Sequence, residues 1–370
     1  MKLDCTRIVR KMDPGRQSVC RNNEKSVADL DSLRLKPLKI GDIQVANRVL
    51  LAPMSGITDA PFRRLAAELG AGLVVSEMTA SDDLVNGKPM SRLRCEATGI
   101  GPHVVQLAGC EARWMAEGAR IAEAAGAEII DINMGCPARH VTGGQSGSAL
   151  MRDLDHAVRL IEATISAVKV PVTLKMRLGW DDRSLNAPEL ARRAEAAGVQ
   201  MISVHGRTRC QFYNGIADWG AVRAVRNAIR IPLVVNGDIT TFEKAVVALE
   251  VSGADAVMVG RGAQGQPWLP GQIARRIETG VVESAPSLAE QLKFIRVLYD
   301  EVCSHYGLRI GLKHARKHLG WALQIAAQYS RAPTTALRGW RERILTSDNP
   351  HFVHRSLQDA FDDFAWSAAA

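Results

Sequence analysis

A-E-I-I-D-I-N-M-G-C-P, at residues 127–137, combines an apolar run with a polar end and a Gly-Cys-Pro turn. The preceding residues, 111–125, have an Ala-rich helical pattern that stops at Gly126, and a glycine is the usual residue just beyond a helix. A uniformly apolar run between helices is typical of a parallel strand with both faces covered. The stretch therefore predicts one helix–strand unit of a parallel α/β fold.

The same unit recurs along the chain. Short apolar runs occur at residues 49–52, 73–77, 104–107, 129–133, 172–176, 201–205, 233–236 and 256–260. Their spacing of roughly 25–40 residues is the length of a βα unit, and helical patterns such as 60–69 lie between them. Eight units predict a (β/α)8 TIM barrel, with a six-stranded doubly wound sheet as the alternative.

A second region follows the barrel. Strand patterns stop after Trp268, residues 278–286 read as a linker, and helical periodicity then runs from about 287 to 364 with breaks near Gly307, 331–333 and 348–350. We therefore expect a catalytic barrel at 35–280 and a small C-terminal helical bundle at 287–365. Residues 1–34 are expected to form a disordered extension.

The positive charge is concentrated in the second region. The chain has 370 residues and a formal net charge of +8. Residues 309–343 hold 8 basic residues against 1 acidic residue, whereas 35–308 hold 30 against 29. Lys313, Arg316 and Lys317 fall on one predicted helix face. A polyanion such as nucleic acid should therefore meet the helical region first.

The cysteine spacing and the hydropathy argue against several classes of protein: disulfide-stabilised, zinc-binding, membrane-spanning and secreted proteins. The seven cysteines are spread along the chain without a C-x-x-C pair, which argues against a disulfide framework and against a zinc site. We expect no metal. No apolar run approaches the roughly 20 residues that span a bilayer, and the N-terminus lacks the apolar segment of a secretory signal. A cytoplasmic protein without a membrane partner is expected.

Polar side chains end most of the predicted strands, and in a barrel these ends form the active-site face. The last two loops, V-N-G-D-I at 235–239 and V-G-R-G-A at 259–263, are typical of a phosphate site. Gly237 and Gly260 would permit close backbone approach, and Arg261 would pair with phosphate oxygens. Two tight turns with a surface arginine are the alternative.

Several strand-end residues suit a neutral planar ligand such as a flavin. Lys175 would be costly to bury alone, so it should face either a ligand oxygen or a carboxylate such as Glu77. Gln106 and Asn236 each offer a donor and an acceptor, as the edge of a flavin ring requires. His205 is either a ligand contact or a satisfied core histidine.

Cys136 is the most informative thiol. Gly135 and Pro137 hold it in a constrained turn after the fourth run, which should place the sulfur over the barrel mouth. A thiol near its ordinary pKa of about 8.5 stays protonated at neutral pH and can donate a proton. Next to a hydride source, such a donor could saturate a polarised C=C bond.

These motifs together resemble the tRNA-dihydrouridine synthases, most closely the bacterial B-type branch. The resemblance spans about residues 35–343 and rests on L-A-P-M-S-G-I-T-D-A-P-F-R (51–63), V-V-Q-L-A-G (104–109), D-I-N-M-G-C-P-A (131–138), L-K-M-R-L-G (174–179), V-H-G-R-T-R (204–209), V-N-G-D-I (235–239), V-G-R-G-A (259–263) and H-A-R-K-H-L-G-W (314–321). One departure is Arg139-His140, where the family often has two lysines.

The resemblance implies an FMN-dependent reduction of a D-loop uridine in tRNA to 5,6-dihydrouridine, with NADPH as reductant and Cys136 as general acid. The implied FMN contacts are Pro53, Met54, Ser55, Gln106, Lys175, His205, Asn236, Gly237, Asp238, Gly260 and Arg261. Asn133 and either Arg177 or Arg207 would hold the uracil carbonyls. Lys313, Arg316 and Lys317 would contact tRNA, and we expect a monomer.

Two other functions are compatible with the sequence. An FMN oxidoreductase acting on a free pyrimidine would also use a Cys-Pro turn after the fourth strand, although the basic helical region argues against it. A non-catalytic tRNA-binding protein that retains the fold would bind tRNA without flavin.

Overall fold

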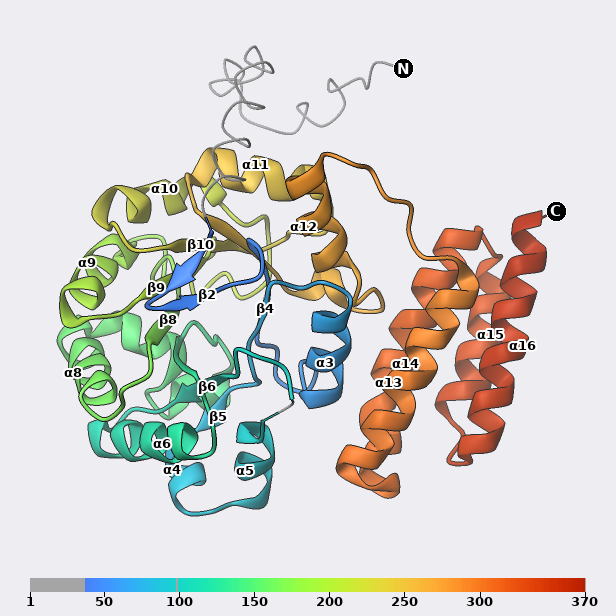
Figure 1. The fold of residues 1–370 in the computed structure, drawn as a ribbon, viewed down its shortest axis with the longest axis horizontal. Helices are drawn as coiled ribbons and strands as arrows, with labels where there is room; N and C mark the ends of the chain where they lie inside the picture. The colour runs from blue at the N-terminus through green and yellow to red at the C-terminus, as the bar shows by residue number, and fades with distance from the viewer. Residues whose placement is uncertain (1–36, 98, 370) are drawn as a thin grey trace, which may run out of the picture. The chain divides into compact units, whose positions relative to one another are not determined.

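The apolar runs form one parallel sheet in the computed structural model, which describes residues 37–97 and 99–369 (Figure 1). The predicted extension at 1–34 lies outside the described residues. In order of pairing, the strands are β4 (Leu73–Val74), β3 (Val49–Leu51), β11 (Ala256–Val259), β10 (Leu233–Asn236), β9 (Met201–His205), β8 (Val172–Arg177), β7 (Ile129–Met134), β6 (Val104–Ala108) and β5 (Thr79–Ala80).

The sheet closes on itself. β4 and β5 belong to one extended segment, and beyond β4 a parallel bridge joins Val75 to Val104 at the start of β6. The Ser76 amide also donates to the Val104 carbonyl at 3.1 Å. Eight strand positions therefore follow one another around a ring in chain order, which confirms the (β/α)8 barrel. The doubly wound alternative is wrong because its strand order would reverse.

Helices join and cover the strands. They are α3 (Ala60–Glu68), α4 (Ser81–Val85), α5 (Pro89–Cys95), α6 (Ala112–Ala124), α7 (Arg139–Gly143), η2 (Gly147–Arg152), α8 (Leu154–Ile165), α9 (Ala187–Ala197), α10 (Trp219–Ala228), α11 (Phe242–Ser252), η3 (Arg261–Ala263) and α12 (Leu269–Thr279). Side chains of Asp59, Asp153, Asp218 and Thr241 cap the first amides of α3, α8, α10 and α11. Gly126 follows α6 with φ 95°, as the sequence predicts.

A small hairpin closes the amino-terminal end of the barrel. Its strands, β1 (Lys39–Ile40) and β2 (Ile43–Gln44), turn at Gly41, whose φ is 58°. Ile40 is fully buried in a cluster with the first residues of several strands, among them Ile129, Met201 and Ala256. Only the carboxyl end of the barrel is therefore left for a ligand.

Helices α13 (Leu288–Tyr306), α14 (Leu308–Ser330), α15 (Thr334–Leu345) and α16 (Pro350–Ala369) follow the barrel. A capping box of Ser287 and Glu290 begins α13. Contacts with α3 join this region to the barrel, because Arg64 pairs with Glu301 at 3.0 Å and His318 stacks on Phe62 with ring centroids 5.3 Å apart. Within the described residues, none of the helices is both long enough and apolar enough to cross a membrane.

Replacing Ile40 with alanine should destabilise the barrel. The side chain is fully buried in the hairpin cluster, and removing such a side chain leaves a cavity worth about 2–5 kcal/mol of unfolding free energy. Urea unfolding followed by circular dichroism measures the loss. The control is Val247→Ala on α11, where the side chain is 45% exposed and the change should stay within about 0.5 kcal/mol. If the two variants lost the same free energy of unfolding, the burial of Ile40 in the hairpin cluster would not contribute to the stability of the barrel.

Candidate active site

A cavity of about 770 Å³ opens at the carboxyl ends of the strands, a size that suits a small-molecule ligand. The structure brings most of the predicted site residues together in its lining: Pro53, Met54, Ser55, Gln106, Asn133, Cys136, Lys175, Arg177, His205, Asn236, Gly237, Asp238, Gly260 and Arg261. Among the described residues, no group of three or more His, Cys, Asp or Glu is placed to hold a metal ion.

The loop after β3 is held in place by its own side chains. The Thr58 hydroxyl accepts from the Met54 amide at 2.8 Å, and Asp59 caps α3 through the Phe62 amide at 3.1 Å. Gly56 has φ 74°, and its amide donates to the buried Glu77 carboxylate. The A-P-M-S-G-I-T-D motif therefore encodes a fixed wall of the cavity.

A buried hydrogen-bond chain fixes Asn133. Asp131 accepts from the Thr173 hydroxyl and from the Gln106 amide, both at 2.6 Å. The Gln106 carbonyl accepts from Asn133 Nδ2 at 2.8 Å, and Asn133 Oδ1 accepts from the Cys136 amide at 2.9 Å. Both ends of the Gln106 amide are thus used inside the protein, so Gln106 orients Asn133 even though it lines the cavity.

Burial and nearby cations have opposite effects on the pKa of the Cys136 thiol. Burial raises the pKa of the thiol, while nearby Arg177 and Lys175 act in the opposite direction and do not overcome it. The Cys136 carbonyl accepts from the Ser148 amide at 3.1 Å and hydroxyl at 2.8 Å. The turn is therefore rigid, and the thiol is protonated at neutral pH.

Lys175 faces Asn236 instead of the carboxylate proposed as its alternative partner. Its ammonium donates to Asn236 Oδ1 at 3.1 Å, and Asn236 Nδ2 in turn donates to the Met258 carbonyl at 2.7 Å. Glu77 is engaged by the Gly56 amide and lies 4.0 Å from Arg94. Burial lowers the pKa of Lys175 to about 8. The ammonium therefore keeps donor capacity for a ligand oxygen.

Arg177 ties the loop after β9 to the cavity wall. Its guanidinium donates to the carbonyls of Gly135, Thr208 and Phe212, each at 2.8 Å. Burial lowers the pKa of Arg177 to about 10, so the group stays charged at neutral pH. Phe212 has φ 51°, a conformation that a non-glycine residue rarely adopts. The three carbonyl contacts hold this strained backbone in place.

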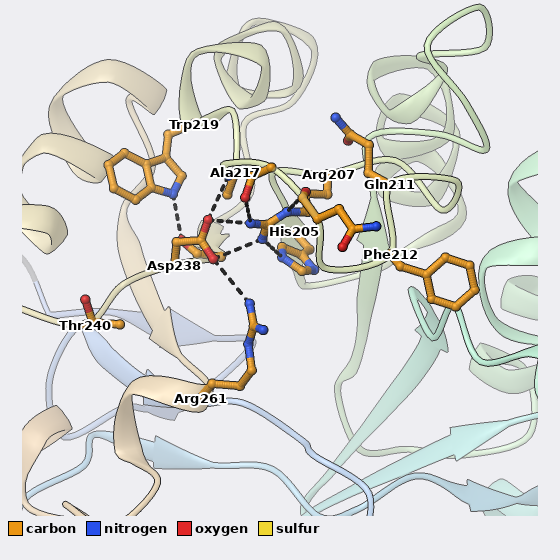
Figure 2. A network of polar contacts seen from close by, with 12 residues as sticks. His205, Arg207, Gln211, Phe212, Ala217, Trp219, Asp238, Thr240 and Arg261 are labelled. Atoms are coloured by element: carbon orange, nitrogen blue, oxygen red, sulfur yellow. Dashed lines mark hydrogen bonds and ion pairs between the residues drawn. The ribbon is translucent and has the colours of Figure 1, made fainter. Parts of the chain in front are cut away.

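Arg207 does not line the cavity. Its side chain is 1% exposed and pairs with both oxygens of Asp238, at 3.0 and 2.6 Å (Figure 2). Asp238 also accepts from the Ala217 amide at 2.8 Å and lies 3.3 Å from Arg261. Burial alone would raise the pKa of Asp238, but Arg207 and these contacts lower it. This placement argues against direct contact between Arg207 and a uracil carbonyl.

The cavity has further lining residues that were not among the expected ligand contacts. They are Ala52, Ile57, Met78, Arg94, Gly135, Pro137, Ala138, His140, Phe212, Tyr213, Ile239, Thr240, Gly262 and Gln264. Many of these lie in loops, where side chains have no regular period. The R-C-Q-F-Y stretch at 209–213, directly after a polar strand end, is the one signal that could have identified Phe212 and Tyr213.

The three basic residues of α14 do not form one exposed face. Lys313 is exposed, and Arg316 pairs with Asp348 at 2.6 Å. Lys317 is half-buried toward the loop after β3, where burial lowers its pKa although Asp59 and Glu77 act in the opposite direction. Lys313 is therefore the member best placed to meet a polyanion.

Alkylation should distinguish Cys136 from the exposed Cys210. The thiolate is the nucleophile, and burial raises the pKa of Cys136 above its ordinary value. Iodoacetamide at pH 7 should therefore modify Cys210 first, and the rate at Cys136 should keep increasing with pH above 9. Mass spectrometry of the digested protein over a pH series gives both rates. Rapid modification of Cys136 at pH 7 would show that its thiol is ionised.

Comparison with known proteins identifies relatives. The dihydrouridine synthase family model matches residues 50–362. A probable tRNA-dihydrouridine synthase of Rhizobium leguminosarum bv. phaseoli is 54% identical over 321 residues, which are 86% of this chain and 97% of the relative. The tRNA-dihydrouridine synthase B of Xanthomonas axonopodis pv. citri is 47% identical over 77% of this chain and 86% of its own. Histamine dehydrogenase of Rhizobium sp. 4-9 shares the fold, with a TM-score of 0.52, 15% identity and coverage of 73% of this chain and 51% of that chain.

Proposed function

The chain belongs to the dihydrouridine synthase family, and on that premise we propose that it reduces a D-loop uridine of tRNA to 5,6-dihydrouridine, with FMN as cofactor and NADPH as reductant. One observation carries the proposal: a protonated, rigidly held Cys136 thiol shares a cavity of about 770 Å³ with a buried lysine and a set of polar strand ends.

Cys136 supplies the proton. When bound, a reduced flavin would supply the hydride for uracil C6, and the Cys136 thiol donates its proton to C5, so that one hydride and one proton saturate the double bond. Asn133 and Arg177 line the same cavity and can donate hydrogen bonds to the uracil carbonyls. A positioned general acid of this kind contributes about 10²- to 10⁴-fold in rate.

The strand ends fit a flavin. The Lys175 ammonium makes one hydrogen bond to Asn236 and has two more protons to donate, so it can hold a carbonyl oxygen or ring nitrogen. A Cβ at Gly260 would make only an ordinary van der Waals contact, 3.7 Å from the Ala52 Cβ, so the protein does not crowd the backbone there. Arg261, half-exposed beside Asp238, can turn to a phosphate. We propose as FMN contacts Lys175, Asn236, Gly260 and Arg261, together with Pro53, Met54, Ser55, His205, Gly237 and Asp238.

The helices after the barrel bind the tRNA in this proposal. A uridine must leave its stack before it can enter the cavity, which costs a few kcal/mol, and contacts to the RNA backbone have to supply that energy. Lys313 on α14 and Arg338 on α15 are exposed. We propose residues 287–365 as the tRNA-binding region, with Lys313, Arg316 and Lys317 among its contacts and the barrel at 35–280 as the catalytic region.

Replacing Cys136 with alanine should separate cofactor binding from catalysis. The variant should bind FMN and be reduced by NADPH as the parent is, while dihydrouridine formation in unmodified tRNA falls about 10²- to 10⁴-fold. The control is Cys110→Ala, whose sulfur lies outside the cavity lining. Undiminished activity in Cys136→Ala would remove Cys136 from the acid role. Reduction of free uridine as fast as tRNA would instead favour a small-molecule oxidoreductase.

Neutralising the exposed charge on α14 should weaken tRNA binding. Lys313→Gln should lower tRNA affinity and reduce the slope of log K against log salt by about one, because each lost phosphate contact removes about one released counterion. Filter binding at several salt concentrations measures the slope. Lys169→Gln, at the exposed amino-terminal end of β8, is the matched control. An unchanged slope in Lys313→Gln would exclude Lys313 as a phosphate contact.

A further inference from the structure

The imidazole of His205 meets an obligate donor on one side. Arg207 Nη1 lies 3.3 Å from His205 Nε2 (Figure 2). A guanidinium has only N–H donors and stays charged, so the nitrogen facing it has to be an acceptor. Nε2 therefore carries a lone pair and no proton.

The ring as a whole is neutral. His205 is 8% exposed, and four cations, Lys175, Arg177, Arg207 and Arg261, act on it. Burial and these charges hold the pKa of His205 well below its ordinary value. A neutral imidazole has one N–H. Because Nε2 is unprotonated, that proton lies on Nδ1.

The opposite edge of the ring is the one available to a ligand. A Cβ at Gly237 would lie 2.7 Å from His205 Cδ2 and 3.0 Å from Nε2, so the Gly237 backbone packs against the Nε2 edge. His205 lines the cavity, and Nδ1 has no hydrogen-bond partner among the residues that the structure describes. The Nδ1–H is thus a donor without an internal acceptor.

We propose that Arg207 is a positioning residue that holds His205 as the neutral Nδ1–H tautomer and so gives the cavity a fixed hydrogen-bond donor. The ligand atom it would recognise is an acceptor, either a carbonyl oxygen or an unprotonated ring nitrogen. Its assignment to FMN rests on the proposed function, whereas the tautomer does not.

Arg207 is held so firmly that it can impose this choice. Besides the two Asp238 contacts, its Nε donates to the Asn214 carbonyl at 3.0 Å and its Nη2 to the Gly215 carbonyl at 2.8 Å. Asp238 itself is fixed by the Ala217 amide and has φ 54°. A protonated Nε2 would place two donors against each other, and the guanidinium has no room to turn away from it.

Nitrogen-15 NMR of the flavin-free protein, labelled at histidine, tests the tautomer directly. The His205 signal, identified by its loss in His205→Asn, should show a protonated Nδ1 and an unprotonated Nε2, unchanged from pH 6 to pH 8. In Arg207→Met the signal should shift toward a mixture of tautomers or toward a cationic ring at pH 6. A protonated Nε2 in the parent protein would overturn the proposal, and so would an unchanged tautomer in Arg207→Met.

A matched control separates positioning from stability. Arg226 also pairs with a carboxylate, Asp255 at 2.6 Å, and donates to the carbonyls of Ile229 and Ile231. Arg226→Met should destabilise the barrel without altering the His205 spectrum. If Arg207→Met does not fold, Arg207→Lys retains the charge with fewer donors and should give a partial shift of the spectrum. A spectrum of Arg207→Lys identical to that of the parent would also contradict the proposal.

Amide substitutions test the donor position on the ligand side. The amide of an asparagine reaches the place of Nδ1, and that of a glutamine reaches the place of Nε2. His205→Asn should therefore bind FMN within about threefold of the parent, whereas His205→Gln should weaken it roughly five- to tenfold, the equivalent of one hydrogen bond. The reverse order would contradict the proposal. If the parent protein does not bind FMN, the proposed function fails while the NMR result still decides the tautomer.

Discussion

Closure of the parallel sheet is the constraint on which the site depends. Once Val75 pairs with Val104, the strands have no free edge and their carboxyl ends share one rim. The register then sets neighbours, because Arg177 pairs with His205 and His205 with Asn236 across adjacent strands. Residues from units that are about 30 positions apart in sequence meet for this reason alone. The β1–β2 hairpin packs on the other end of the strands, and the cavity lies at their carboxyl ends.

Buried cations then organise the loops above that rim. Arg177 and Arg207 are each about 1% exposed, and both donate to backbone carbonyls of the loop after β9. A buried charge without such partners would be strongly destabilising, so the two guanidiniums and the loop conformation stabilise each other. The strained backbone at Phe212 persists because Arg177 holds its carbonyl. The loop is thus part of the site's rigid frame, although it contains no helix or strand.

The sequence alone predicts those features of the structure that depend on a local pattern of residues. The eight strand positions, the glycine after α6 and the polar strand ends follow from periodicity and from the rule that the carboxyl ends face the site. The sequence alone does not predict the contacts between side chains from βα units that are far apart along the chain. The Arg207–Asp238 pair joins residues 31 positions apart, and Lys317 lies beside the loop after β3, within reach of the charges of Asp59 and Glu77. No helical wheel contains that information, since it depends on which face α14 packs against.

Burial reconciles two opposing demands on the chemistry of the cavity. A cation is needed to hold an electron-rich ligand, yet a cation beside a thiol favours its ionisation and would remove the proton from a general acid. Here burial raises the pKa of Cys136 despite Arg177 and Lys175, and it lowers the pKa of Lys175 to about 8. Both shifts have the same cause, so water entering the cavity would reverse both. The burial that keeps the thiol protonated thus still leaves Lys175 mostly charged near neutral pH, so one cavity can hold both the cation and the general acid.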